Sequence, residues 1–261
     1  MTTLTHAATD SATMLRRNLR HALRYPSLSI AGMMTPIFIM MLFVGVFGNA
    51  LGEGVGGPAK GDYITYVAPG IILMAVASGC LTTSVSVSLD MTEGIVDRFR
   101  TMAIARVSLL TGHVVGSMIQ TVISTAAVIG VAVAMGFRTD GSLLDWLAAI
   151  GLLVLLIFAL TWVAVALGLL AKTPEGASNS PLIIQFLPFV GSAIVPPESM
   201  PAGVRWFAEY QPFTPIIETL RGLLVGTPDA QDAVVSVAWC AGLAAGGYVL
   251  SKVLFDRKAP R

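Results

Sequence analysis

Six long stretches of the sequence contain no Asp, Glu, Lys or Arg residue, and short charged segments separate them. These uncharged stretches are residues 25–52, 63–89, 107–137, 146–171, 176–197 and 233–251. A helix needs roughly 20 apolar residues to cross the ~30 Å hydrocarbon core of a membrane, and each stretch supplies about that number. The pattern predicts an all-α membrane protein with six transmembrane helices, at about residues 28–49, 63–88, 109–135, 146–171, 177–196 and 233–253.

A basic amphipathic segment, residues 12–26, precedes the first predicted span. One helical face carries Leu15, Leu19, Ala22 and Leu23, and the pattern ends at Pro26. The opposite face is lined by four arginines, which are Arg16, Arg17, Arg20 and Arg24. We expect an interfacial helix on the membrane surface, whose arginines set the orientation of the chain or bind anionic lipid headgroups.

The charged segment at residues 90–106 lies between the second and third predicted spans and has a helical period of its own. Its acidic side chains share one face, its apolar side chains share the opposite face, and two arginines add positive charge. The acidic residues are Asp90, Glu93 and Asp97, and the arginines are Arg98 and Arg100. The apolar residues are Met91, Ile95, Val96, Phe99 and Met102. The segment is either a solvated loop or a cytoplasmic coupling helix, and its length and apolar stripe favour a docking surface for a partner.

The segment at residues 198–231, before the last predicted span, is too charged and too often interrupted by proline to cross a membrane. Its apolar residues nevertheless have helical spacing, which predicts short re-entrant helices that dip into the outer leaflet. Glu218 and Arg221 are three residues apart on one helical face. They either pair at the membrane boundary or form an ordinary surface ion pair.

Composition and charge support a membrane protein and indicate its orientation. Of 261 residues 55% are hydrophobic and only 12% are charged, whereas an ordinary soluble domain has about 25% charged residues. With six spans and the N-terminus inside, 12 of the 16 Lys and Arg residues lie on the cytoplasmic side. Because basic residues gather on cytoplasmic flanks, both termini are predicted to be cytoplasmic, in a multi-pass protein of the bacterial inner membrane.

Several kinds of chemistry have no support in the sequence. No Gly-Lys dipeptide occurs, so there is no Walker A phosphate loop, and the three histidines are too scattered for a zinc site. The net charge of +1 gives no reason to expect nucleic acid as a partner. The six uncharged stretches hold no Asp or Glu for coupling to protons or sodium, and His113 lies near the cytoplasmic start of a predicted span, so the energy for any transport is expected to come from another subunit.

Two segments resemble the daunorubicin-resistance type of permease among the ATP-binding-cassette exporters of the second family. The first resemblance lies in the predicted coupling helix and just beyond it, and the second lies before the last span. The residues that carry it are Asp90, Glu93, Gly94, Ile95, Asp97, Arg98, Phe99, Arg100, Met102, Ile104, Arg106 and Gly112, and then Pro212, Phe213 and Arg221. The likeness in span layout extends over nearly the whole chain and implies a single permease domain at residues 1–261.

The resemblance implies a transporter subunit that is not itself an enzyme. A separate ATPase, in two copies, is expected to bind ATP and Mg²⁺, while a second permease chain, identical or paralogous, completes the membrane part. In this family the N-terminal helix also touches the ATPase. The expected cargo is a lipophilic or amphipathic drug, antibiotic, polyketide or lipid. The alternatives are a channel or facilitator that works without ATP, an export permease for polysaccharides, and a membrane-anchored scaffold.

Overall fold

A computed structural model describes residues 26–48, 60–92 and 106–257, and all regular structure in these residues is helical. The eight α-helices are α2 (Pro26–Met40), α4 (Lys60–Thr92), α6 (Arg106–Ala134), α7 (Leu143–Leu170), α8 (Pro174–Phe186), α9 (Ala202–Tyr210), α10 (Phe213–Val225) and α11 (Ala230–Arg257). A π-helical stretch, Met41–Val46, continues α2, and the two short 3-10 helices are Leu187–Val190 and Pro197–Ser199.

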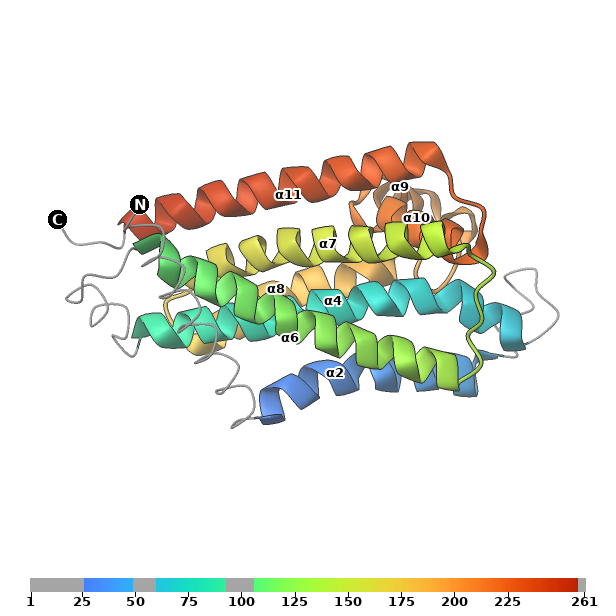
Figure 1. Ribbon diagram of the computed structural model, residues 1–261, viewed down its shortest axis with the longest axis horizontal. Helices are drawn as coiled ribbons and strands as arrows, with labels where there is room; N and C mark the ends of the chain where they lie inside the picture. The colour runs from blue at the N-terminus through green and yellow to red at the C-terminus, as the bar shows by residue number, and fades with distance from the viewer. Residues whose placement is uncertain (1–25, 49–59, 93–105, 258–261) are drawn as a thin grey trace.

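Six of these helices, α2, α4, α6, α7, α8 and α11, run along the length of one bundle and alternate in direction (Figure 1). The short helices α9 and α10 gather at one end, beside the start of α4. We call this the cap end. The opposite end, which we call the base, holds the last turn of α4, the first turn of α6 and the last turn of α7. The two ends of the predicted coupling segment therefore meet the bundle at the base.

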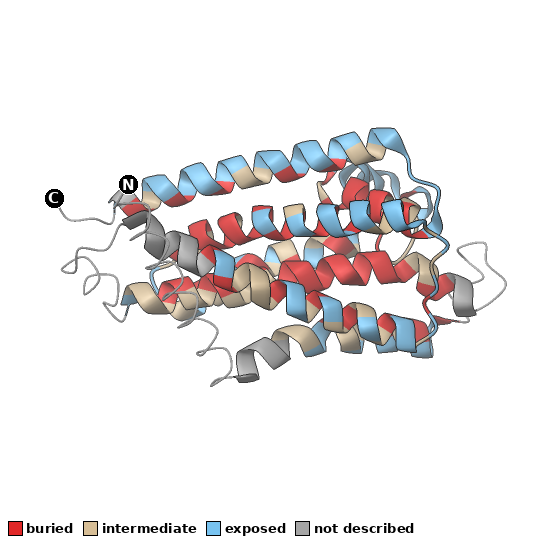
Figure 2. Ribbon diagram, viewed as in Figure 1, coloured by how far each residue is buried: buried red, intermediate tan, exposed pale blue. Residues whose placement is uncertain are grey.

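Helix α4 lies at the centre of the bundle, in contact with α2, α6, α7 and α8 (Figure 2). Its cap-end half is almost continuously buried, from Tyr63 to Ala77, because the sequence there is apolar all round the helix rather than on one face. Helix α11 differs, since it packs on α7 and leaves its outward face exposed. A single central helix thus connects the base to the cap end.

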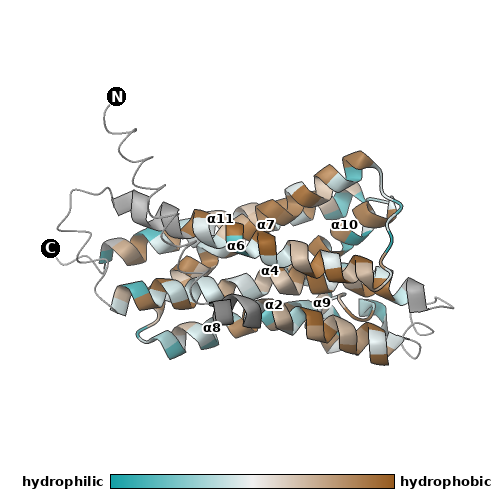
Figure 3. Cartoon of the chain, turned by 60° about the horizontal axis from the view of Figure 1, so that its bottom comes forward, coloured by the Kyte–Doolittle hydropathy of each residue, from teal (hydrophilic) through white to brown (hydrophobic). Residues whose placement is uncertain are grey.

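Within the described residues, four helices are long and apolar enough to cross a membrane: Tyr63–Thr92, Val114–Ala134, Leu143–Leu170 and Ala230–Phe255. Apolar residues predominate along their lengths, and hydrophilic residues gather mainly toward the ends of the bundle (Figure 3). The first predicted span corresponds to a shorter apolar helix, Gly32–Val46. The fifth corresponds to α8, which has 13 residues and gives way to a 3-10 turn at Leu187. The six-span count therefore stays a prediction.

The predicted coupling segment begins within α4, because that helix continues to Thr92. Asp90 and Met91 are half-buried, and Met91 packs against a cluster at the base that includes Trp162 and Phe255. The other residues given a coupling role, Glu93, Ile95, Asp97, Arg98, Phe99, Arg100 and Met102, lie outside the described residues, as do Arg16, Arg17, Arg20 and Arg24.

Candidate functional site

The candidate site at the cap end is built around α10, a short helix enclosed by protein. Pro212 and Pro215 fall before and within its first turn, where the missing N–H of proline leaves no helical bond unmade. The helix ends at Gly226, whose φ of +82° is the left-handed conformation that glycine adopts readily. The apolar face is buried by Phe213, Ile216, Ile217, Leu220, Leu223 and Leu224. Glu218 and Arg221 project from the remaining face.

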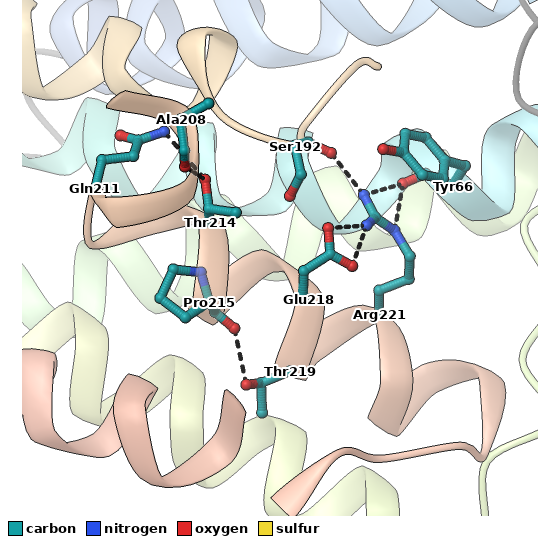
Figure 4. Close-up of polar contacts among 9 residues, drawn as sticks. All are labelled: Tyr66, Ser192, Ala208, Gln211, Thr214, Pro215, Glu218, Thr219 and Arg221. Atoms are coloured by element: carbon teal, nitrogen blue, oxygen red, sulfur yellow. Dashed lines mark hydrogen bonds and ion pairs between the residues drawn. The ribbon is translucent and has the colours of Figure 1, made fainter. Parts of the chain in front are cut away.

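Arg221 uses its whole guanidinium group to join three parts of the chain (Figure 4). Its Nη1 atom donates to both carboxylate oxygens of Glu218. Its Nε and Nη2 atoms donate to the main-chain carbonyl of Tyr66 on α4, at 3.2 and 3.1 Å. The Nη2 atom also donates to the carbonyl of Ser192, at 2.7 Å. A planar fork of donors suits this arrangement, and a lysine could not reproduce it.

The Arg221 guanidinium also lies over an aromatic ring, with its central carbon 3.8 Å from the centroid of Tyr66. A cation at this distance is attracted by the negative face of the ring. The side chain of Arg221 is only 13% exposed, whereas that of Glu218 is 34% exposed, so water screens the pair from one side. The sequence allowed this pair, and the structure contains it. Together these contacts fix α10 to α4.

The stretch between α8 and Pro197, residues 187–196, packs closely against α4 and α10. A Cβ atom added to Gly70 of α4 would lie 2.4 Å from the Ala193 side chain, so only glycine permits the observed approach. Next to it, Ser192 is fully buried and directs its carbonyl to Arg221. The irregular backbone that follows α8 is therefore held between α4 and α10.

The corner between α9 and α10 has its own polar contacts. Gln211, which ends α9, is 4% exposed and donates from Nε2 to the carbonyl of Leu187 at 3.0 Å. Thr214, in the first turn of α10, donates its hydroxyl hydrogen to the carbonyl of Ala208 on α9. Further along α10, the hydroxyls of Thr219 and Ser236 are 2.9 Å apart and link α10 to α11.

Helix α9, in contrast, is exposed along nearly its whole surface, and Ala208 is its one buried residue. Trp206 and Tyr210 are 66% and 67% exposed, and their rings lie 5.6 Å apart. Arg205 and Glu209 form an ion pair at 2.7 Å, and the hydrogen bond and charge of Glu209 raise the pKa of Arg205 above its ordinary value. Aromatic side chains with polar tips are typical of a membrane–water boundary.

Four residues named in the sequence analysis lie in or directly before α10. Pro212, Phe213, Glu218 and Arg221 lie at the start and on the polar face of α10, as a helical reading of the segment requires. The sequence pattern did not identify Tyr66, Ser192 or Gln211. Tyr66 and Ser192 offer main-chain carbonyls that are 155 and 29 residues away from Arg221, and no sequence pattern marks a carbonyl acceptor. Gln211 directly precedes Pro212, but a lone glutamine before a proline does not predict a contact with Leu187.

The described parts of the chain contain no group of three or more His, Cys, Asp and Glu side chains that could hold a metal ion. The cap-end site is thus a junction between helices, held by one cation, one carboxylate and main-chain carbonyls. Contacts of this kind are suited to holding helices in a fixed relative position.

Comparison with known proteins agrees with the resemblance found in the sequence. The family model described as "ABC-2 type transporter" matches residues 10–225. The chain is 27% identical over 253 residues to the "Daunorubicin resistance ABC transporter permease protein DrrB1" of Streptomyces coeruleorubidus, over 97% of this chain and 88% of that protein. It is 25% identical over 167 residues to the "Probable doxorubicin resistance ABC transporter permease protein DrrC" of Mycobacterium tuberculosis (strain CDC 1551 / Oshkosh), over 62% of this chain and 60% of that protein. Since the family match covers most of its length, the chain belongs to the ABC-2 type transporter family.

Proposed function

We propose that this chain is the membrane-spanning permease subunit of an ATP-driven exporter that moves a lipophilic or amphipathic compound, such as a drug or antibiotic, out of the cytoplasm or the inner leaflet. The observation that carries the proposal is the similarity to a daunorubicin resistance permease over 97% of the chain. The four long apolar helices support a protein that works within the bilayer.

In this proposal the base faces the cytoplasm of a bacterial cell and the cap end faces outward, so both termini are cytoplasmic. The alternating directions of the six lengthwise helices are compatible with six crossings, if the π-helical extension of α2 and the irregular stretch after α8 complete the two short ones. Among the described basic residues, Lys172, Lys252 and Arg257 lie at the base. Lys60, Arg138, Arg205 and Arg221 lie at the cap end, so the orientation is proposed from the whole sequence, in which 12 of the 16 Lys and Arg residues fall on the cytoplasmic side.

The ATPase partner is proposed to grip residues 90–106 at the base. There Ile95, Phe99 and Met102 would seat the helix against an apolar surface. Asp90, Glu93 and Asp97 would offer carboxylates to basic groups of the ATPase, and Arg98 and Arg100 would pair locally or with the partner. Two ATPase copies would bind ATP and Mg²⁺, and a second permease chain, identical or paralogous, would complete the membrane part.

Helix α4 gives the proposed coupling a physical route. It carries Asp90 in its last turn and Tyr66 near its start, under the Arg221 guanidinium. At about 1.5 Å per residue its 33 residues span about 50 Å. A displacement of the base end by the ATPase would therefore reach the cap-end junction through one continuous helix. We propose that the junction seals the outer side, and that α9 lies among the outer headgroups.

The test is ATP-dependent export by the chain co-expressed with an ABC ATPase encoded beside it, followed with a fluorescent anthracycline in inverted membrane vesicles. Phe99→Asp and Glu93→Lys should insert normally but lose co-purification with the ATPase and lose export. Arg205→Ala, in the exposed helix α9, is the matched control and should retain both. Transport that proceeds without ATP and without the ATPase subunit would contradict the proposal and favour a channel or facilitator. Export of a polysaccharide instead of the anthracycline would show that the proposed class of cargo is wrong.

A further inference from the structure

The residues 187–193 follow α8 directly and pack against the corner between α9 and α10. The last carbonyls of an α-helix have no partner within the helix, so their partners must come from elsewhere. The carbonyl of Leu187, the residue that follows α8, accepts a hydrogen bond of 3.0 Å from the side-chain amide of Gln211, which is itself buried. The same amide lies 3.4 Å from the hydroxyl of Thr214, which is itself bonded to α9. Gln211 thus connects the end of α8 to the corner.

Gly191 shows how tightly the amide meets the backbone of this stretch. A Cβ atom at Gly191 would lie 2.3 Å from Nε2 of Gln211 and 2.8 Å from Oγ1 of Thr214, so no other residue fits without displacing them. The next residue is Ser192, whose carbonyl accepts the 2.7 Å bond from Arg221. The path of the backbone at 191 therefore decides where the carbonyl of Ser192 points.

We propose that Gln211 is a positioning residue for the Arg221 junction. By bonding Leu187 and lying against Gly191, its amide holds the stretch 187–192 in the path that presents the Ser192 carbonyl to Arg221. Gln211 does not touch Arg221 itself and acts through the backbone between them. The inference rests on the proposed function, in which this junction is required for export.

The first experiment compares export by Gln211→Ala and Gln211→Glu with that of the wild type, with each chain assembled with its ATPase. Both variants should export about tenfold more slowly, because the loss of one hydrogen bond to the partly buried carbonyl of Leu187 changes an equilibrium by about that factor. Gln211→Glu keeps the shape of the side chain, but its carboxylate cannot donate to Leu187. In an Arg221→Ala background the same two changes should have no further effect. A tenfold loss that persists without Arg221 would overturn the proposal.

The second experiment tests the contact with Gly191. Gly191→Ala should lower export in the wild-type background, and Gln211→Ala should make this change harmless, because it removes the atom that the new Cβ meets. A general loss of stability would instead make the double variant worse than either single variant. That outcome would contradict a positioning role.

A third measurement reports the backbone directly. Ser192 is fully buried, so a thiol introduced as Ser192→Cys should react slowly with maleimide in the detergent-purified complex. Adding Gln211→Ala should speed labelling at least tenfold, relative to the native thiols as background. Unchanged labelling together with unchanged export in Gln211→Ala would refute the inference alone, whereas normal export by Arg221→Ala would refute the role of the junction in the proposed function.

Discussion

Replacing Arg221 by alanine is the sharpest perturbation of the cap-end junction. The change removes the donors of two main-chain carbonyls, those of Tyr66 and Ser192, and leaves the carboxylate of Glu218 without its partner. Breaking a fully buried ion pair costs about 3–5 kcal/mol. Glu218 is 34% exposed and regains water on one side, so the lower part of that range applies to the pair. Since the carbonyl of Ser192 stays buried, we expect a total loss of about 3 kcal/mol of stability.

The assay is thermal unfolding of the detergent-purified protein, followed by the loss of the monodisperse species. Export is measured in parallel, and co-purification with the ATPase, which is proposed to bind at the opposite end, should be unaffected. Arg221→Lys should fall between wild type and alanine, because an ammonium group cannot serve the carboxylate and both carbonyls at once. Adding Glu218→Gln to Arg221→Ala should restore about 1 kcal/mol by removing the unpaired charge. If Arg221→Ala unfolds at the wild-type temperature, the junction does not hold the cap end together.

Three further predictions concern the scaffold, and each is checked by the same unfolding measurement. Thr219→Val removes the hydroxyl contact with Ser236 between α10 and α11 and should cost about 1 kcal/mol, and equal stability would mean that this contact is not formed. Gly168→Ala in α7 should destabilise the protein strongly, because its Cβ would lie 2.6 Å from a carbonyl oxygen of α4. Gly151→Ala on the same helix meets open space and should leave stability unchanged. Equal stability of the two variants would contradict the close packing of α7 on α4. Ser142→Ala removes the cap of α7 and should cost about 1 kcal/mol, and an unshifted transition would show that the cap is dispensable.

The long helices were predictable because their signal is a continuous apolar run. The sequence predicted a span at 146–171, and the structure begins α7 three residues earlier, at Leu143. The reason is local, since Ser142 and Asp145 bond each other's backbone N–H groups and so cap the helix. A serine followed by an acidic residue three positions later was visible in the sequence. An apolar run, however, measures hydrophobicity and does not mark where a helix starts.

The early end of α8 and the partners of Arg221 were less accessible to sequence reasoning. The run 176–197 is uncharged throughout, but the α-helix ends at Phe186, and Pro188 in the 3-10 turn is the first local sign of a break. The bonds of Arg221 depend on which backbone passes beside it. The path of that backbone follows from its packing on α4 at Gly70, and the pattern of side chains in the sequence does not predict it.

The end of the α-helix at Phe186 also restricts the direction in which the helices at the cap end can separate. A 13-residue helix is about 20 Å long, so if α8 crosses the membrane, a 3-10 turn and irregular backbone would have to cover the rest of a ~30 Å hydrocarbon layer. Acyl chains offer such a backbone no hydrogen bonds, and here its carbonyls at 187 and 192 are served by Gln211 and Arg221. A rupture that faced lipid would strand both carbonyls. If the cap end lies within the bilayer, we therefore expect an exit that faces water or another polypeptide rather than a lateral opening into the membrane.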